Sequence, residues 1–129
     1  MRTEKGQSIV ELAVLFPLLM LLLMGLLDLG RAYYIMVALR DAAEEGATYA
    51  AIDPHDQTEI KARATDACGD LIAISADDVQ IATASLTPGE PITVTINYQY
   101  DFYMPLAQPF LPEEGLTLRG QAIHPIINP

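Results

Sequence analysis

Few residues in this chain have the types and spacing that support catalysis or metal binding. The two histidines, His55 and His124, lie far apart in the sequence, and neither belongs to a metal-binding or catalytic-triad motif. His55 lies between Asp53 and Asp56, whose carboxylates could hold a divalent cation weakly with its help. A solvated loop that follows a helix is the favoured interpretation of this stretch.

Other candidate positions are equally weak. The pair Asp77 and Asp78 precedes a predicted strand, but its spacing matches no calcium-binding loop. Cys68 is the only cysteine, which excludes an intrachain disulfide framework and a cysteine-rich zinc site, so we expect it to be a small buried residue. The sequence contains no phosphate-binding glycine loop and no nucleophile elbow. We therefore expect no catalytic residues, no metal, no cofactor and no enzymatic activity.

Charge is distributed unevenly along the 129 residues, whose formal net charge is −10. Residues 41–129 contain fourteen acidic and three basic side chains, so this part alone has a net charge of −11. Such a surface repels nucleic-acid phosphates and anionic lipid surfaces, which makes nucleic acid a poor candidate partner. Basic partners and divalent cations remain possible.

The longest apolar run of the sequence lies near the N-terminus. Residues 1–6 carry Arg2 and Lys5 against Glu4, and residues 12–27 contain no charged side chain. With its flanks, the run reaches the ~20 residues needed to cross a hydrocarbon core. The basic excess before it places the N-terminus in the cytoplasm. We predict a leader at 1–6, a transmembrane segment at 7–29 and an extracytoplasmic part at 30–129.

One carboxylate, Glu11, stands at the beginning of this run and needs a partner. A charged side chain costs ~2.5 to 3.5 kcal/mol at the centre of a membrane helix and less near its end. If the chain were cut between Gly6 and Gln7, Glu11 would be the fifth residue of a new helix, where the helix dipole favours negative charge. Its counter-charge would be the free amine of Gln7 on an adjacent subunit. Pro17 is expected to kink the helix, which a membrane tolerates when neighbouring groups satisfy the freed backbone.

The order of these features resembles a known processing signature. A glycine, a cut, a glutamate five residues into the mature chain and a long apolar helix are similar to the N-termini of type IV pilin-like proteins. The wider sequence resembles the TadE-like family of minor pseudopilins from tight-adherence pilus systems. The matching positions are Gly6, Gln7, Glu11, Pro17, Ala42, Ala43, Gly46, Ala47, Ala50 and Ala51. The resemblance implies a prepilin peptidase, other pilins and pseudopilins, and the membrane assembly platform of the pilus as partners.

Beyond the apolar run the pattern stays helical until the breaker at Asp53 and Pro54. A helix from about Ser8 to Ile52 would be ~65 Å long at ~1.5 Å per residue, so about half of it must project from the membrane. The apolar positions expected to form its stripe are Leu29, Tyr33, Met36, Val37, Ala43 and Ala47. The residues expected to allow close helix packing are Ala38, Ala42, Ala43, Gly46, Ala47 and Ala50. They could seat the helix against its own sheet, which is favoured, or against another subunit.

The rest of the chain predicts a short helix and three strands. The helix begins at 55–58 with Asp56 or Thr58 as its cap and ends near Cys68 and Gly69. Its predicted apolar stripe is Ile60, Ala64, Ala67 and Leu71. Strands are predicted at 79–86, 92–102 and 116–123, with a hairpin loop at 87–90 and a proline-rich loop at 104–115. The expected fold is α+β, with an antiparallel sheet of about three strands on the protruding half of the helix.

Four aromatic residues at the end of the second predicted strand offer one more candidate surface. They are Tyr98, Tyr100, Phe102 and Tyr103. Aromatic side chains can form a binding surface, but tyrosines that alternate along a strand are more often part of the core. We therefore expect a role in packing.

The preferred hypothesis is a single-pass minor pseudopilin of the bacterial cytoplasmic membrane, cut by a prepilin peptidase and active in pilus assembly, initiation or anchoring. Leu12 follows Glu11 where the short major pilins typically have tyrosine, and the chain is longer than they are, which favours the minor role. One alternative is a signal-anchored extracytoplasmic binding module with an acidic sheet domain. Another is secretory cleavage after Ala32, which would release a soluble domain that begins at Tyr33.

Overall fold

The computed structural model describes residues 3–69, 72–103 and 115–128. In chain order its elements are α1 (Thr3–Ile52), α2 (Gln57–Cys68), a 3-10 turn (Ala76–Asp78), β1 (Val79–Thr83), β2 (Pro91–Tyr100) and β3 (Leu116–Pro125). The three strands form one antiparallel sheet in the order β1-β2-β3. The predicted α+β architecture is therefore confirmed.

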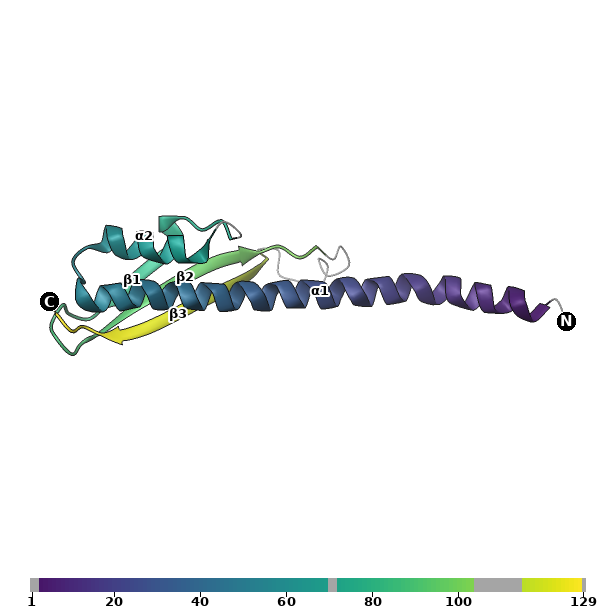
Figure 1. The fold of residues 1–129 in the computed structure, drawn as a ribbon, viewed down its shortest axis with the longest axis horizontal. Coiled ribbons are helices and arrows are strands. Elements are labelled where there is room, and N and C mark those ends of the chain that lie inside the picture. Colours follow the sequence, from purple (N-terminus) through teal and green to yellow (C-terminus); the bar gives the residue numbers. More distant parts are fainter. Residues whose placement is uncertain (1–2, 70–71, 104–114, 129) are drawn as a thin grey trace.

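Helix α1 is a single element of 50 residues that continues through Pro17. At ~1.5 Å per residue its length is ~75 Å. Figure 1 shows its N-terminal half extending alone, while the sheet and α2 lie along its C-terminal half. The predicted long helix is confirmed, and its two halves have different surroundings.

The buried face of α1 differs from the predicted stripe. Leu29, Tyr33, Met36 and Val37 are helical as predicted, but they are exposed, Leu29 at 65% and Tyr33 at 66%, so this part of the stripe does not face the domain. The positions that are buried are Asp28, Ile35, Leu39, Ala42, Ala43, Gly46, Ala47, Ala50 and Ala51. A helix that is apolar on several sides offers more than one stripe at three- and four-residue spacing. The domain packs on the side where small side chains let other backbones come close.

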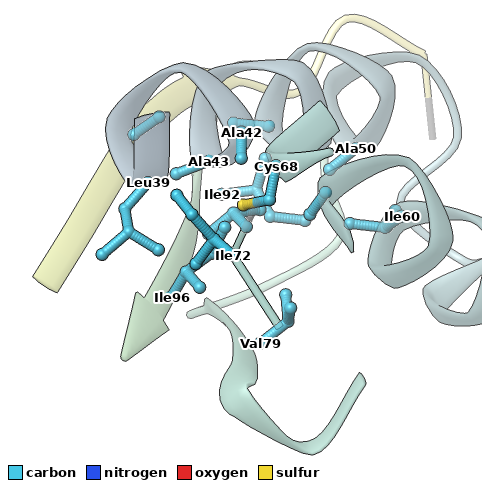
Figure 2. Packing of buried hydrophobic residues seen from close by; sticks show 14 of the residues in the cluster. Leu39, Ala42, Ala43, Ala50, Ile60, Cys68, Ile72, Val79, Ile92 and Ile96 are labelled. Carbon is cyan, nitrogen blue, oxygen red and sulfur yellow. The ribbon is translucent and has the colours of Figure 1, made fainter. Parts of the chain in front are cut away.

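Gly46 shows how tight this packing is. A Cβ atom added there would lie 3.1 Å from the Cβ of Ala64 on α2 and 3.3 Å from Cγ1 of Val94 on β2. Figure 2 shows the surrounding core, in which side chains from α1, α2 and the sheet meet. Its labelled members are Leu39, Ala42, Ala43, Ala50, Ile60, Cys68, Ile72, Val79, Ile92 and Ile96.

Helix α2 has the ends that its sequence predicts. The Asp56 carboxylate accepts a hydrogen bond from the backbone N–H of Glu59 at 3.0 Å, and Gly69, with φ of +68°, ends the helix. Ile60, Ala64 and Cys68 are buried. Ala67 is exposed, contrary to the prediction, because the face turned toward α1 is centred on Ala64 and leaves Ala67 at its margin. The predicted stripe residue Leu71 lies outside the described residues.

The strands lie close to their predicted positions. The hairpin between β1 and β2 closes with a hydrogen bond from the N–H of Glu90 to the carbonyl of Thr87 at 3.1 Å, and Gly89 has a φ of +91°. β1 ends at Thr83, before the predicted Leu86, while β3 continues two residues beyond the predicted Ile123. Most of the predicted proline-rich loop, residues 104–114, lies outside the described residues.

Strand β2 carries the alternation that predicts a one-sided sheet. Ile92, Val94 and Ile96 are fully buried against α1, and so is Tyr100. On the other face Gln99 is exposed, but Thr95 is only 6% exposed, contrary to the alternation. Tyr98 and Phe102 pack against the core and are partly buried, as the packing interpretation of the aromatic stretch predicts. Only Tyr103 of the four aromatic residues is strongly exposed, at 69%.

The sheet and the covered part of α1 have the same length. The ten residues of β2 span ~33 Å at ~3.3 Å per residue, and the 24 residues from Asp28 to Ala51 span ~35 Å of helix. Hydrogen bonds fix both ends. The Tyr100 hydroxyl donates to the carbonyl of Asp28 at 2.9 Å, and the N–H of Ile127 donates to the carbonyl of Ala51 at 2.7 Å.

Candidate assembly site on the N-terminal helix

The N-terminal half of α1 exposes a long series of large apolar side chains. Residues 6–27 lie outside the core, and side chains such as Val14, Leu18 and Leu22 are 74%, 62% and 67% exposed. Among the described residues, α1 is the one helix that is long and apolar enough to cross a membrane. Exposed apolar side chains on this scale need a nonaqueous partner, and a membrane anchor satisfies that need.

Glu11 is the one carboxylate within residues 6–27. The side-chain amide of Gln7 donates a hydrogen bond to Oε1 of Glu11 at 3.1 Å, one helical turn apart. The same face forms a shallow hollow of about 340 Å³ whose other lining residues are Val10, Val14, Leu15 and Leu18. A carboxylate accepts several hydrogen bonds, so Glu11 can still accept one from a donor on another chain.

Gly6 and Gln7 lie within the first turns of α1. Neither packing nor backbone conformation accounts for a glycine at position 6, because a Cβ added there would meet nothing within 4 Å. The three glycines with positive φ among the described residues are Gly69, Gly89 and Gly115. Gly6 is therefore a position at which the fold itself places no demand for glycine.

Pro17 lies six residues beyond Glu11, inside α1. Proline has no backbone N–H, so the carbonyl of Ala13 lacks its usual helical donor. In an apolar environment such a carbonyl needs another donor or a local adjustment of the helix. Pro17 thus leaves the Ala13 carbonyl as a second polar group on a segment that has few.

The small residues predicted to pack helices are buried inside the chain itself. Ala42, Ala43, Ala47 and Ala50 have no measurable exposure, and α2, β2 and β3 all contact this part of α1. These residues and Gly46 are thereby occupied by the domain. A further polar link joins β3 to the same part of α1, because Nε2 of His124 lies 2.7 Å from Oε1 of Glu44.

The acidic residues near His55 and before β1 have local structural roles. Asp53 Oδ1 accepts a hydrogen bond from the N–H of His55 at 3.2 Å, and Asp56 caps α2. Asp78 accepts hydrogen bonds from both the N–H and the hydroxyl of Ser75. Within the described ranges, no group of three or more histidine, cysteine, aspartate or glutamate side chains could hold a metal ion.

Cys68 is a free cysteine, buried between α2 and the sheet. Burial raises the pKa of its thiol from 9.0 to about 11, because the thiolate would lose its hydration. At neutral pH the thiol is protonated and behaves as a small apolar side chain. This agrees with the prediction of a buried structural residue.

A polar cluster at the end of the apolar segment was not foreseen from the sequence. We call it the junction cluster and define it as Asp28, Arg31, Tyr100 and Tyr103. Asp28 is only 4% exposed, and its Oδ1 accepts a hydrogen bond from the N–H of Tyr103 at 3.2 Å. The Arg31 guanidinium carbon lies 5.2 Å and 4.4 Å from the ring centroids of Tyr100 and Tyr103.

The surroundings of Tyr100 in the junction cluster shift the pKa of its phenol. Burial raises the pKa of the Tyr100 phenol above its usual value, the nearby Asp28 carboxylate adds to the rise, and Arg31 opposes it. The phenol therefore remains protonated and donates to the Asp28 carbonyl. The spacing of Asp28 and Arg31, one turn apart at the end of an apolar run, is the only sequence signal that could have indicated this contact.

Comparisons with known proteins add one finding. The family described as TadE-like protein matches residues 6–48, about a third of the chain. The match begins at Gly6 and includes Glu11, Pro17 and most of the buried small residues of α1, so the resemblance is confirmed over this segment. No curated protein and no solved structure matches the chain.

Proposed function

We propose that this protein is a minor pseudopilin of a tight-adherence type pilus, held in the membrane by the N-terminal half of α1 and active in pilus assembly, initiation or anchoring. The observation that carries the proposal is the apolar face of residues 6–27, which no described part of the domain covers and which bears a single carboxylate. The TadE-like match over residues 6–48 supports the same assignment.

Gly6 supports the proposed processing step. A glycine that neither packing nor φ requires is explained if another protein must recognise it. In the proposed step a prepilin peptidase cuts between Gly6 and Gln7 on the cytoplasmic side of the membrane. The cut removes the basic leader and leaves Gln7 with a free amine.

Glu11 then directs the subunit into the assembly. In the mature chain it lies in the first helical turn, where the dipole favours a negative charge. Its remaining hydrogen-bonding capacity would accept the amine of Gln7 on an adjacent subunit, and such charge-assisted contacts contribute ~1.5 to 3 kcal/mol. The partners in this proposal are pilins, other pseudopilins and the assembly platform.

N-terminal analysis of membrane-extracted protein tests the processing step. We expect a chain that starts at Gln7 in cells containing the peptidase, and a full-length chain from the Gly6→Ala variant. Gly30→Ala is the matched control, since Gly30 is also a helical glycine with nothing within 4 Å of an added Cβ. Recovery of only full-length wild-type chain from such cells would contradict the proposal.

Glu11→Gln tests the assembly step, because it keeps the size and hydrogen bonding of the side chain and removes its charge. We expect recovery of the subunit with sheared or affinity-purified pilus complexes to fall at least tenfold, the factor that corresponds to ~1.5 kcal/mol. Membrane insertion and cleavage should be unchanged. Undiminished assembly of this variant would favour the alternative, a binding module that uses α1 only as a signal anchor.

A further inference from the structure

A groove of about 360 Å³ lies between α1 and β3, on a side of the helix that the sheet leaves open. We call it the α1–β3 groove. Its apolar wall comes from Tyr33, Met36 and Val37, and its polar rim from Arg40, Arg119 and Gln121. All six side chains are exposed.

The two arginines of the groove are the notable charges of an acidic domain. No hydrogen bond, ion pair or ring contact joins Arg40 or Arg119 to another residue in the described part of the chain. The other arginines there are engaged: Arg63 pairs with Glu59 at 3.0 Å, and Arg31 lies over two tyrosine rings. Two free guanidiniums beside an apolar wall complement a ligand that is anionic at one end and apolar at the other.

The apolar wall of the groove continues into the membrane segment. Residues that follow one another by three or four positions lie on one face of a helix. Such a row leads from the apolar segment into the groove, and each member is exposed: Leu18, Leu22, Leu26, Leu29, Tyr33, Met36 and Arg40. A molecule that lies along the membrane part of this row meets no covered residue before it reaches Arg40.

The height of the arginines matches the lipid headgroups. A hydrocarbon core of ~30 Å that begins at Leu12 ends about 20 residues later, near Arg31. Arg40 lies nine residues, or ~13 Å, beyond this boundary, and its side chain points back over roughly one turn, ~5 Å. The guanidinium therefore lies ~8 Å above the hydrocarbon, at the outer edge of a headgroup layer that is ~5 to 8 Å thick.

We propose that the α1–β3 groove binds one anionic phospholipid, with its phosphate between Arg40 and Arg119 and its acyl chains along the exposed row of α1. The inference rests on the membrane anchorage in the proposed function and is independent of cleavage and assembly. A domain with a net charge of −11 is repelled by an anionic bilayer. Two arginines at the headgroup level offset this repulsion locally and hold the domain close to the membrane surface.

Native mass spectrometry of the delipidated full-length chain in neutral detergent tests the groove. The chain is titrated with phosphatidylglycerol and with phosphatidylcholine of identical acyl chains. We expect one phosphatidylglycerol to bind with a preference of about 25-fold, about fivefold from each arginine. Arg40→Gln and Arg119→Gln should each reduce this preference about fivefold, and the double variant should abolish it.

A matched control is the Lys61→Gln, Arg63→Gln double variant on α2, which removes the same charge away from the groove. It should keep the lipid preference, and far-UV circular dichroism should show the same helix content for all variants. Equal binding of both lipids to the wild type, or equal loss of preference in both double variants, would overturn the proposal. Displacement of the lipid by millimolar inorganic phosphate would also overturn it, because the groove would then take a free anion.

A separate measurement distinguishes failure of this site from failure of membrane anchorage. The full-length chain is reconstituted in phosphatidylcholine vesicles and subjected to flotation after carbonate extraction. Protein that floats with the vesicles but shows no lipid preference contradicts the groove alone. Protein that does not float contradicts the anchorage and the groove together.

Discussion

Gly120 of β3 lies where the sheet comes very close to the backbone of α1, and its substitution should destabilise the domain strongly. A Cβ atom added there would collide with the backbone carbonyl of Leu39 and lie 2.8 Å from the backbone nitrogen of Arg40. Gly120 has no positive φ, so the effect of Gly120→Ala comes from this contact alone. Overpacking costs ~1 to 3 kcal/mol, and a collision with the Leu39–Arg40 peptide group cannot be relieved by a rotamer change, because these are backbone atoms. We therefore expect a cost of ~3 kcal/mol.

Such a cost is a large fraction of the stability of a domain this small, which is ~5 to 10 kcal/mol. Urea unfolding of the full-length chain in mild detergent, followed by tyrosine near-ultraviolet circular dichroism, measures it. With a slope of ~2 kcal/mol per molar urea, the midpoint should fall by ~1.5 M. Gly30→Ala is the control, because its added Cβ meets nothing and alanine favours the helix, so its midpoint should equal or exceed that of the wild type. An unchanged midpoint for Gly120→Ala would refute the close contact between β3 and α1.

Two further predictions concern the junction cluster and the buried thiol. Tyr100→Phe removes the hydrogen bond to the Asp28 carbonyl and should lower the free energy of unfolding by ~1 kcal/mol in the same urea assay, with Tyr98→Phe as a control that leaves this bond in place. Because the pKa of Cys68 is raised from 9.0 to about 11 in the folded chain, its stabilising contribution is complete below pH 9 and is lost as the pH rises toward 11, by at most ~1.4 kcal/mol per pH unit. The free energy of unfolding, measured from pH 8 to 11, should therefore fall less steeply with pH for Cys68→Ala than for the wild type. Equal slopes for the two proteins would contradict the raised pKa.

The parts of the fold that local chemistry determines were predictable from the sequence. The alternation from Ile92 onward predicts one buried face, and Ile92, Val94 and Ile96 lie on the face that β2 turns toward α1. Thr95, on the face predicted to be exposed, is buried as well. Asp56 before the apolar positions of α2 and Gly69 after them supply the two helix ends. These signals act over a few residues, so a single sequence contains all that they need.

The side of α1 that the domain covers could not be predicted in the same way. Leu29 and Met36 are large apolar residues like Ile35 and Leu39, and both pairs fit a helical stripe, but only the second pair is buried. The side of α1 that the domain covers depends on close contacts, such as that of Gly120 with Leu39, between residues that are distant in the sequence. For the same reason the sequence could identify Gly6 and Glu11 as candidates but could not bring Arg119 next to Arg40.

The length of the sheet gives the junction cluster its position relative to the membrane. Because β2 and the covered part of α1 have equal lengths, a sheet anchored at Ala51 necessarily ends beside Asp28. A strand two residues longer would extend ~7 Å further along α1, beside the exposed apolar side chains that precede Asp28, and its backbone donors would lack partners there. A shorter strand would leave the Asp28 carboxylate without the Tyr103 N–H that it now accepts. The fold thus places its last polar contacts at the residue where the exposed apolar helix begins.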